Sequence, residues 1–196
     1  MTEDTYDHTG STEGKSGQYV PRDVDAEDVI EELIDVFPDV EKVERKKGNR
    51  AEVRIPESIV PEVLTRFRDS GYDHFVALTC IDIIEESSFE LVYHLFSYGS
   101  RVHVHVKTSV DRERPSIRSV VGVFRPAVTY EREIKEMFGV DFPGNPRLTQ
   151  FILEDWEGPP PMRKDFDSIA YVRERYGIEV RNPKGLPPQP KKGGGS

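Results

Sequence analysis

The chain has 196 residues, enough for one compact domain with extensions or for two small domains. Its net charge of −9 argues against a nucleic-acid-binding protein, because phosphate backbones select clustered positive charge. The single cysteine excludes an internal disulfide, a four-cysteine zinc site and an iron–sulfur cluster held by this chain alone. No apolar run approaches the roughly 20 residues needed to cross a bilayer.

The composition divides the chain into four parts. Residues 1–22 are acidic and polar, which predicts a disordered tail. Residues 182–196 are rich in proline, lysine and glycine, which predicts a flexible tail. Between the two tails we expect an α+β domain at residues 23–140 and an extended segment at residues 141–181.

The hydrophobic pattern of the central part predicts alternating groups of helices and strands. In chain order the predicted elements are a helix from a cap at Asp25 to Phe37, strands at 40–45 and 51–55, a helix at 57–68, strands at 74–84, 89–97 and 101–109, a short helix or turn at 119–124, and a helix at 127–138 that ends at Gly139. The order α-ββ-α-βββ-α predicts an α+β fold in which helices cover one face of a mainly antiparallel sheet. A long, irregular, proline-rich C-terminal segment that wraps around a surface is expected to follow.

Three histidines of the last two predicted strands could meet on one face of the sheet. If residues 99–100 form a two-residue hairpin loop, His94 lies opposite His105, and His103 lies two residues away on the same face. Three imidazoles can bind zinc, so a stand-alone zinc hydratase or hydrolase is one hypothesis. We favour an exposed polar face, because no carboxylate is predicted nearby and two basic side chains of the same strand repel a cation.

The helix at residues 127–138 carries three carboxylates, which could form a general acid–base pair. The spacing of Glu131 and Lys135 instead predicts an ion pair along the helix. Arg132 and Glu136 have the same spacing, so we expect a structural ion-pair network on a solvated face. Cys80 lies within an apolar strand, where a thiol is usually an inert small hydrophobe. No catalytic residue is predicted.

Large apolar side chains and prolines alternate with charged residues at positions 145–166. Proline restricts the backbone, and aromatic residues, methionine and arginine are enriched at the cores of protein interfaces. This composition predicts an interaction surface, although a loop that packs on its own domain would look similar. A free acidic adaptor that binds unrelated proteins through residues 156–166 is a further hypothesis.

Three stretches of this region carry a specific resemblance. Residues 130–140 read YEREIKEMFGV, residues 142–148 read FPGNPRL, and residues 162–166 read MRKDF. Together they resemble the signature of the 30-kDa subunit family of respiratory complex I, the C subunit of NADH-quinone oxidoreductase. The same family occurs in membrane-bound, energy-converting NiFe hydrogenases and in related sulfur reductases.

The resemblance implies a cofactor-free assembly subunit in the hydrophilic arm of a membrane-bound, ion-pumping oxidoreductase, itself without a catalytic or metal-binding residue. Its partners would be a hydrogenase-type large subunit, an iron–sulfur small subunit and, indirectly, antiporter-like membrane subunits. Partner subunits would hold the iron–sulfur clusters and, in the hydrogenase branch, a nickel–iron centre. The location implied is peripheral, on the cytoplasmic side of the cell membrane. The expected interface residues are Glu131, Arg132, Glu133, Phe138, Asn145, Pro146, Trp156, Met162, Arg163, Lys164, Asp165 and Phe166.

Departures from the family pattern bear on the branch. Complex I members typically read HPxLRRIL and GHPLR, whereas residues 145–153 here read NPRLTQFIL and residues 158–163 read GPPPMR. Both changes resemble hydrogenase-type and sulfur-reducing relatives. We therefore expect a hydrogenase-like or sulfur-reductase-like branch, with the C subunit of a quinone-reducing complex I as the alternative.

Overall fold

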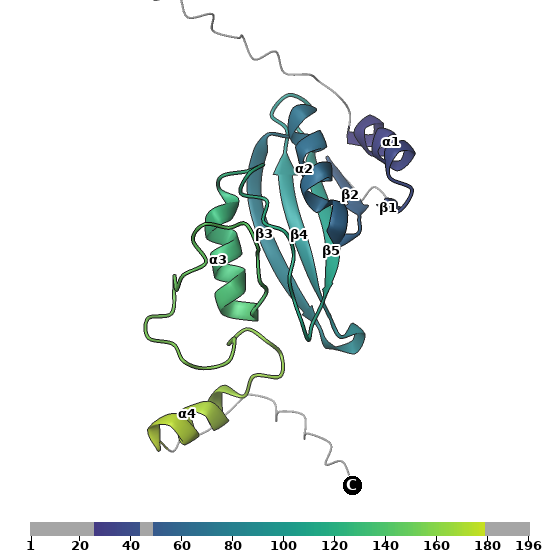
Figure 1. The fold of residues 1–196 in the computed structure, drawn as a ribbon. Helices are drawn as coiled ribbons and strands as arrows, with labels where there is room; N and C mark the ends of the chain where they lie inside the picture. Colours follow the sequence, from purple (N-terminus) through teal and green to yellow (C-terminus); the bar gives the residue numbers. More distant parts are fainter. Residues whose placement is uncertain (1–25, 44–48, 179–196) are drawn as a thin grey trace, which may run out of the picture.

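A computed structural model describes residues 26–43 and 49–178 (Figure 1). The helices are α1 (Ala26–Val36), α2 (Val60–Asp69), α3 (Ala127–Phe138) and α4 (Ser168–Tyr176). The strands are β1 (Glu41–Val43), β2 (Arg50–Arg54), β3 (His74–Ile83), β4 (Ser88–Phe96) and β5 (His103–Asp111). The predicted cap at Asp25 and the two predicted tails lie outside the described residues.

The five strands form one sheet in the order β1-β2-β5-β4-β3. Every neighbouring pair is antiparallel except β2 and β5, which run parallel. Helices α1, α2 and α3 lie on the same face of the sheet (Figure 1). The predicted α+β class, with helices on one face of a mainly antiparallel sheet, is therefore confirmed.

The hydrophobic core lies between this face and the helices. Because side chains alternate along a strand, the helix-facing positions of β4 and β5 are almost fully buried, and all of them except Thr108 are apolar. Burial of each such side chain stabilises the fold by about 1.5–3 kcal/mol. The largest apolar members of this core, each with less than 2% of its surface exposed, are Tyr72, Tyr93, Phe67, Phe89, Phe142, Ile30, Leu64, Leu91 and Leu95.

The glycine that ends α3 allows the C-terminal segment to pass close to the helix. Gly139 has a φ of 84°, in the left-handed region that glycine adopts without strain, and its N–H donates to the Lys135 carbonyl. A Cβ at this position would lie 3.0 Å from Cγ of Pro160. Gly139 therefore both ends the helix, as predicted, and allows the C-terminal segment to cross it closely.

The β4–β5 hairpin has the predicted register but a different loop. His94 lies directly opposite His105. The expected two-residue loop is wrong, however, because Ser97 N–H donates to the carbonyl of Val102 at 3.1 Å and leaves four residues between them. Arg101 closes this loop in the left-handed region with a φ of 57°.

The C-terminal segment contains a helix that was not predicted. α4 begins after Asp167, whose carboxylate accepts hydrogen bonds from the N–H groups of Ile169 and Ala170, and it ends at Gly177 with a φ of 63°. An Asp-Ser start and a glycine end are ordinary helix signals. The helix was not predicted because the prolines nearby in the sequence favour extended backbone.

Candidate functional site

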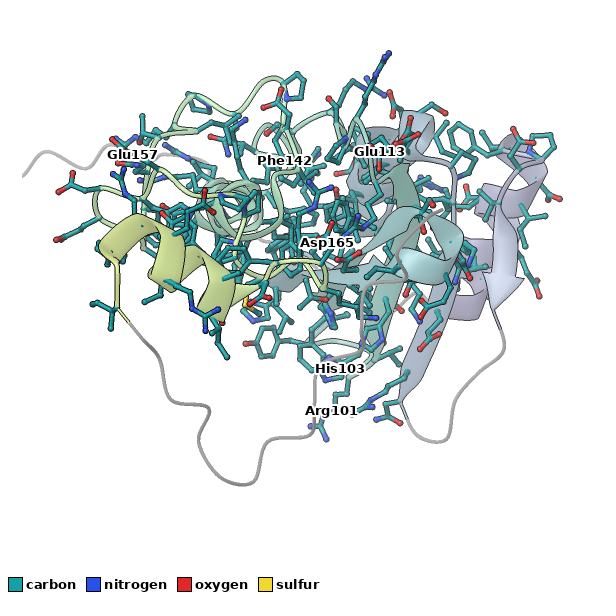
Figure 2. The ribbon with its side chains drawn as sticks, turned by 90° about the horizontal axis from the view of Figure 1, so that it is seen from below. Arg101, His103, Glu113, Phe142, Glu157 and Asp165 are labelled. Atoms are coloured by element: carbon teal, nitrogen blue, oxygen red, sulfur yellow. The ribbon has the colours of Figure 1, made fainter. Side chains whose placement is uncertain are left out.

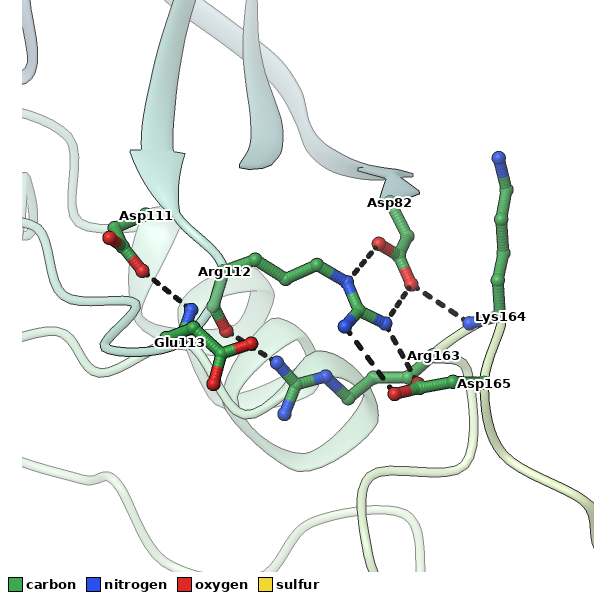
Figure 3. A network of polar contacts seen from close by, with 7 residues as sticks. All are labelled: Asp82, Asp111, Arg112, Glu113, Arg163, Lys164 and Asp165. Atoms are coloured by element: carbon green, nitrogen blue, oxygen red, sulfur yellow. Dashed lines mark hydrogen bonds and ion pairs between the residues drawn. The ribbon is translucent and has the colours of Figure 1, made fainter. Parts of the chain in front are cut away.

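Two arginines and two aspartates join residues 162–166, which we call the signature from here on, to the end of the sheet (Figure 3). We call Asp82, Arg112, Arg163, Lys164 and Asp165 the clamp. Arg112 Nε donates to Asp82 Oδ1 at 2.7 Å, and its Nη2 donates to Asp82 Oδ2 at 3.0 Å. The same Nη2 reaches Asp165 Oδ1 at 2.8 Å, so one guanidinium bridges β3 and the signature.

The other clamp residues complete this contact. The backbone N–H of Lys164 donates to Asp82 Oδ2 at 2.8 Å, while its side chain points away from the other clamp residues (Figure 3). Arg163 Nη2 donates to the carbonyl of Arg112 at 2.5 Å. The guanidinium carbons of Arg112 and Arg163 lie 5.7 and 5.1 Å from the centre of the Phe89 ring. The signature is thus fixed by charge-assisted hydrogen bonds and cation–π contacts.

The electrostatics of the clamp favour its charged state. Only 2% of the Asp82 side chain is exposed. Burial opposes its ionisation, but hydrogen bonds from Arg112 and from the Lys164 N–H outweigh burial and hold its pKa below the ordinary value. The hydrogen bond from Arg112 lowers the pKa of Asp165, and hydrogen bonds to both aspartates raise the pKa of Arg112.

Asp82 and Arg112 were missing from the sequence prediction, although one signal was available. Leu78, Cys80 and Asp82 occupy alternate positions of β3 and therefore share its helix-facing side. A carboxylate that continues an apolar stripe needs a buried cationic partner. The sequence does not say which cation supplies it, because Arg112 lies 30 residues away.

Glu131 of α3 is a second polar centre. Its side chain is fully buried within α3. Its carboxylate accepts hydrogen bonds from Ser119 Oγ at 2.7 Å, Val120 N at 2.8 Å and Asn145 Nδ2 at 2.8 Å. Burial raises the pKa of Glu131 despite these donors. The carboxylate thereby joins α3 to two other segments, residues 119–120 and Asn145.

The predicted pairing of Glu131 with Lys135 is wrong. Lys135 Nζ instead contacts Asp141 Oδ1 at 2.6 Å. The interpretation of the charged run as a solvated face fails at Glu131 because this carboxylate faces the core rather than water. Glu133, two residues along the helix, is exposed as expected.

Arg132 and Glu136, one turn apart on α3, hold the loop at residues 149–153. Glu136 accepts hydrogen bonds from three consecutive backbone N–H groups, those of residues 151, 152 and 153, at 3.0, 2.8 and 3.2 Å. Arg132 donates to the carbonyls of residues 149 and 150 at 3.3 and 2.8 Å, and its guanidinium lies 4.6 Å from the centre of the Phe151 ring. One face of the helix therefore fixes the shape of this loop.

Changing Glu136 to glutamine is expected to loosen this loop without unfolding the domain. Each charge-assisted hydrogen bond contributes about 1.5–3 kcal/mol, and an amide oxygen cannot replace three of them. Hydrogen exchange of the amides at 151–153 should therefore become at least about 10-fold faster. The matched control is Glu133→Gln on the same helix, which should leave these amides unchanged. Equal exchange in both variants would contradict the assigned role of Glu136.

The remaining predicted interface residues divide into packed and outward-facing groups. Trp156 and Phe166 pack on Tyr171 of α4, with ring centres 4.9 and 5.7 Å from it. Phe138 contacts Phe89 edge to face at 5.9 Å. The predicted interface residues whose side chains reach solvent are Glu133, Pro146, Met162, Lys164 and Asp165.

The structure does not gather the three histidines around one point. The ring centres of His94 and His105 are 4.5 Å apart, but the ring of His103 packs against that of Phe96, with 4.6 Å between the centres and 41° between the planes. The expectation that no carboxylate lies nearby is wrong, because the parallel pairing of β2 with β5 places Glu52 opposite His105, with 3.7 Å between Oε1 and Nδ1. Burial lowers the pKa of both His94 and His105. In the described ranges, no group of three or more His, Cys, Asp or Glu residues could hold a metal ion.

Cys80 has the environment of a structural thiol. Burial, with a smaller contribution from the charge of Asp82, raises the pKa of Cys80 to about 12. The thiolate needed for nucleophilic chemistry is therefore disfavoured. Within the part of the chain that the structure describes, no helix is long and apolar enough to span a bilayer.

Comparison with known proteins gives a consistent picture. The family model for the 30-kDa subunit of respiratory-chain NADH dehydrogenase matches residues 53–172. The C subunit of the NADH-quinone oxidoreductase of Moorella thermoacetica is 33% identical over 70% of this chain and 92% of its own length. The C subunit of the F(420)H(2) dehydrogenase of Methanosarcina mazei is 31% identical over 74% of this chain and 94% of its own length.

A solved structure extends the likeness to the fold. A chain of the membrane-bound sulfane sulfur reductase, an archaeal respiratory membrane complex, superposes with a TM-score of 0.70 and 33% identity. The match covers 80% of this chain and 94% of that chain. The family match includes the clamp, Glu131 and the loop at residues 149–153. The chain therefore belongs to the family of the 30-kDa subunit of respiratory-chain NADH dehydrogenase, whose members are subunits of complex I-like oxidoreductases.

Proposed function

We propose that this chain is a cofactor-free assembly subunit that docks a hydrogenase-type large subunit in a membrane-bound, ion-pumping oxidoreductase. The observation that carries the proposal is the clamp, which fixes the signature on the folded domain within the chain itself. A preorganised segment binds a partner with a smaller loss of conformational entropy than a flexible one. The chemistry would belong to the partners, and this chain would set where they sit.

The outward-facing side chains of the signature supply the contact surface. Met162 is 57% exposed although it lies between half-buried neighbours. Lys164 is held through its backbone and its side chain points away from the clamp, so its ammonium group can meet a partner carboxylate. A flexible apolar side chain beside a charge is typical of an interface, where charged pairs set register more than affinity.

The branch that we favour is the hydrogenase-like or sulfur-reductase-like one. The likeness to the sulfane sulfur reductase chain supports it, as do the departures at residues 145–153 and 158–163. The iron–sulfur small subunit would be a further direct neighbour, and antiporter-like membrane subunits would be indirect ones. The relative from Moorella thermoacetica supports the second candidate, the C subunit of a quinone-reducing complex. In either case we place the chain peripherally, on the cytoplasmic side of the membrane.

The proposal predicts that Met162→Glu combined with Lys164→Glu blocks assembly while the chain stays folded. Loss of a central interface contact typically weakens binding by about 10-fold or more. The test is to purify the tagged full chain from native membranes in mild detergent and to identify co-purifying subunits by mass spectrometry. The wild-type chain should recover a large subunit and an iron–sulfur subunit, and the double variant should not. Nickel in the purified complex would indicate the hydrogenase branch. Iron without nickel would indicate either the sulfur-reductase branch or a quinone-reducing complex I.

The matched control is Arg125→Glu, which reverses an exposed charge just before α3 and outside the signature. It should assemble normally. Arg163→Glu is a poor test, because Arg163 belongs to the clamp and its loss would disturb the fold. If the wild-type chain emerges from native membranes without partners, the proposed function is wrong.

A further inference from the structure

The loop at residues 149–153 carries an apolar pair that the fold keeps in solvent. Phe151 is 44% exposed and Ile152 is 49% exposed. Their backbone N–H groups donate to Glu136, which fixes the backbone that presents the two side chains. Exposed apolar side chains that are fixed in place mark interaction sites rather than mobile loops.

Two acidic residues follow the pair after Leu153. Glu154 and Asp155 are exposed, and neither forms an ion pair within the described residues. Asp155 has a φ of 51°, so the chain turns sharply here through a conformation that aspartate tolerates. Glu157, by contrast, pairs with Arg175 of α4 at 2.5 Å and lies on the α4 side of the molecule (Figure 2). The apolar pair therefore lies close in sequence to two carboxylates that form no ion pair within the described residues, while the Arg132 guanidinium lies 4.6 Å from the centre of the Phe151 ring.

This combination limits what the loop can bind. A membrane surface would attract the apolar pair, but the anionic lipids of the cytoplasmic leaflet would repel the two carboxylates. A protein pocket with an apolar floor and a lysine- or arginine-lined rim satisfies both features, because opposite charges across an interface steer and orient binding. A rigid loop also enters such a pocket with a smaller entropy loss than a flexible one.

We propose that residues 151–155 form a docking loop that inserts Phe151 and Ile152 into an apolar pocket with a basic rim on a partner subunit. The inference rests on the proposed function and specifies the chemistry of the second contact. The signature around Met162 and this loop lie on segments that α3 positions separately, through the Met137 carbonyl and through Glu136. The large subunit would thus be held at two points of one rigid surface.

The test places the photocrosslinking residue p-benzoylphenylalanine at position 152 of the full chain in the native complex. Mapping by mass spectrometry should give one peptide of a partner in which apolar residues are flanked by lysine or arginine. Phe151→Ser with Ile152→Ser should reduce recovery of that partner by about 10-fold or more. Glu154→Lys with Asp155→Lys should reduce it as well, and should do so more strongly at low salt. Arg125→Glu, which changes an exposed charge outside the loop and outside the expected interface residues, is the control and should have no effect.

Each other result overturns the inference. A crosslink to lipid, to a second copy of this chain or to a peptide with an acidic rim would assign the loop a different occupant. Normal recovery with both loop variants would show that the loop is not a docking site. If the probe at position 162 crosslinks to a large subunit and the probe at 152 does not, the docking loop fails while the proposed function stands. If no partner co-purifies with the wild-type chain, both the proposed function and the docking loop are wrong.

Discussion

Replacing Arg112 with leucine is expected to lower the free energy of unfolding by about 3–5 kcal/mol, because the change leaves a buried carboxylate without its partner. Asp82 would keep one hydrogen bond, from the Lys164 N–H, and would lose both of those that Arg112 supplies. Asp165 would lose its link to the sheet. The measurement is urea denaturation of the full chain at pH 7, followed by circular dichroism.

The matched control is Arg118→Leu, which removes an exposed ion pair with Glu62. Exposed pairs contribute at most about 1 kcal/mol, so this variant should unfold close to the wild type. Similar losses in the two variants would mean that the clamp contributes no more than a surface pair. The aromatic contacts of Arg163 should persist in both, because Arg163 binds the backbone of residue 112 rather than its side chain.

The clamp also predicts a pH dependence. The pKa of Asp82 and that of Asp165 lie below the ordinary value of 3.8 in the folded chain. Their ionised forms therefore stabilise the fold above that pH, and the contribution is lost as the pH falls through the folded-state pKa. Without Arg112, burial should raise the pKa of Asp82. The stability gap between wild type and Arg112→Leu should consequently be largest near neutral pH and shrink in acid.

Replacing Glu131 with glutamine is expected to lower the free energy of unfolding by about 2–4 kcal/mol, although the shape of the side chain hardly changes. The carboxylate accepts from three donors, and an amide offers only one oxygen. Its NH2 group would then face the NH2 group of Asn145. Asn145 cannot simply flip, because its Oδ1 already accepts the N–H of Arg147 at 2.9 Å.

Thermal and urea unfolding of Glu131→Gln should be compared with Glu133→Gln, an exposed position on the same helix that should change stability by less than about 0.5 kcal/mol. The raised pKa of Glu131 also predicts the direction in which stability changes with pH. A carboxyl group with a raised folded-state pKa stabilises the fold below its ordinary value of 4.5, and this contribution is lost as the pH rises through the folded-state pKa. The gap between wild type and Glu131→Gln should therefore narrow from pH 4 to pH 7, and a constant gap would contradict the assignment.

The parts of the fold that the sequence predicted are those with local signals. The alternation of apolar and polar residues in β4 and β5, together with a short connection, was enough to place His94 opposite His105. The same alternation says which face of β2 is buried but not which strand lies beside it. The parallel neighbour β5, and with it the contact of Glu52 with His105, depends on a crossover that no local pattern encodes.

The candidate site shows the same limit more strongly. The signature residues Arg163, Lys164 and Asp165 were identified from the sequence, but the side chains that hold them come from positions 82 and 112. Glu131 looked like one member of an exposed charged run, because helical spacing pairs it with Lys135. Its burial depends on donors from Ser119 and Asn145, whose positions are set by tertiary packing.

The clamp has a consequence for the order in which the chain is made. Asp82 and Arg112 leave the ribosome well before their last partner, since Lys164 follows Asp82 by 82 residues. Until then the sheet carries a carboxylate on its apolar face whose hydrogen bonds are incomplete. A chain that stops before residue 163 lacks the segment that meets the partner and is also less stable, which favours its degradation. The contacts that shape the docking surface thus favour chains that extend at least to Asp165.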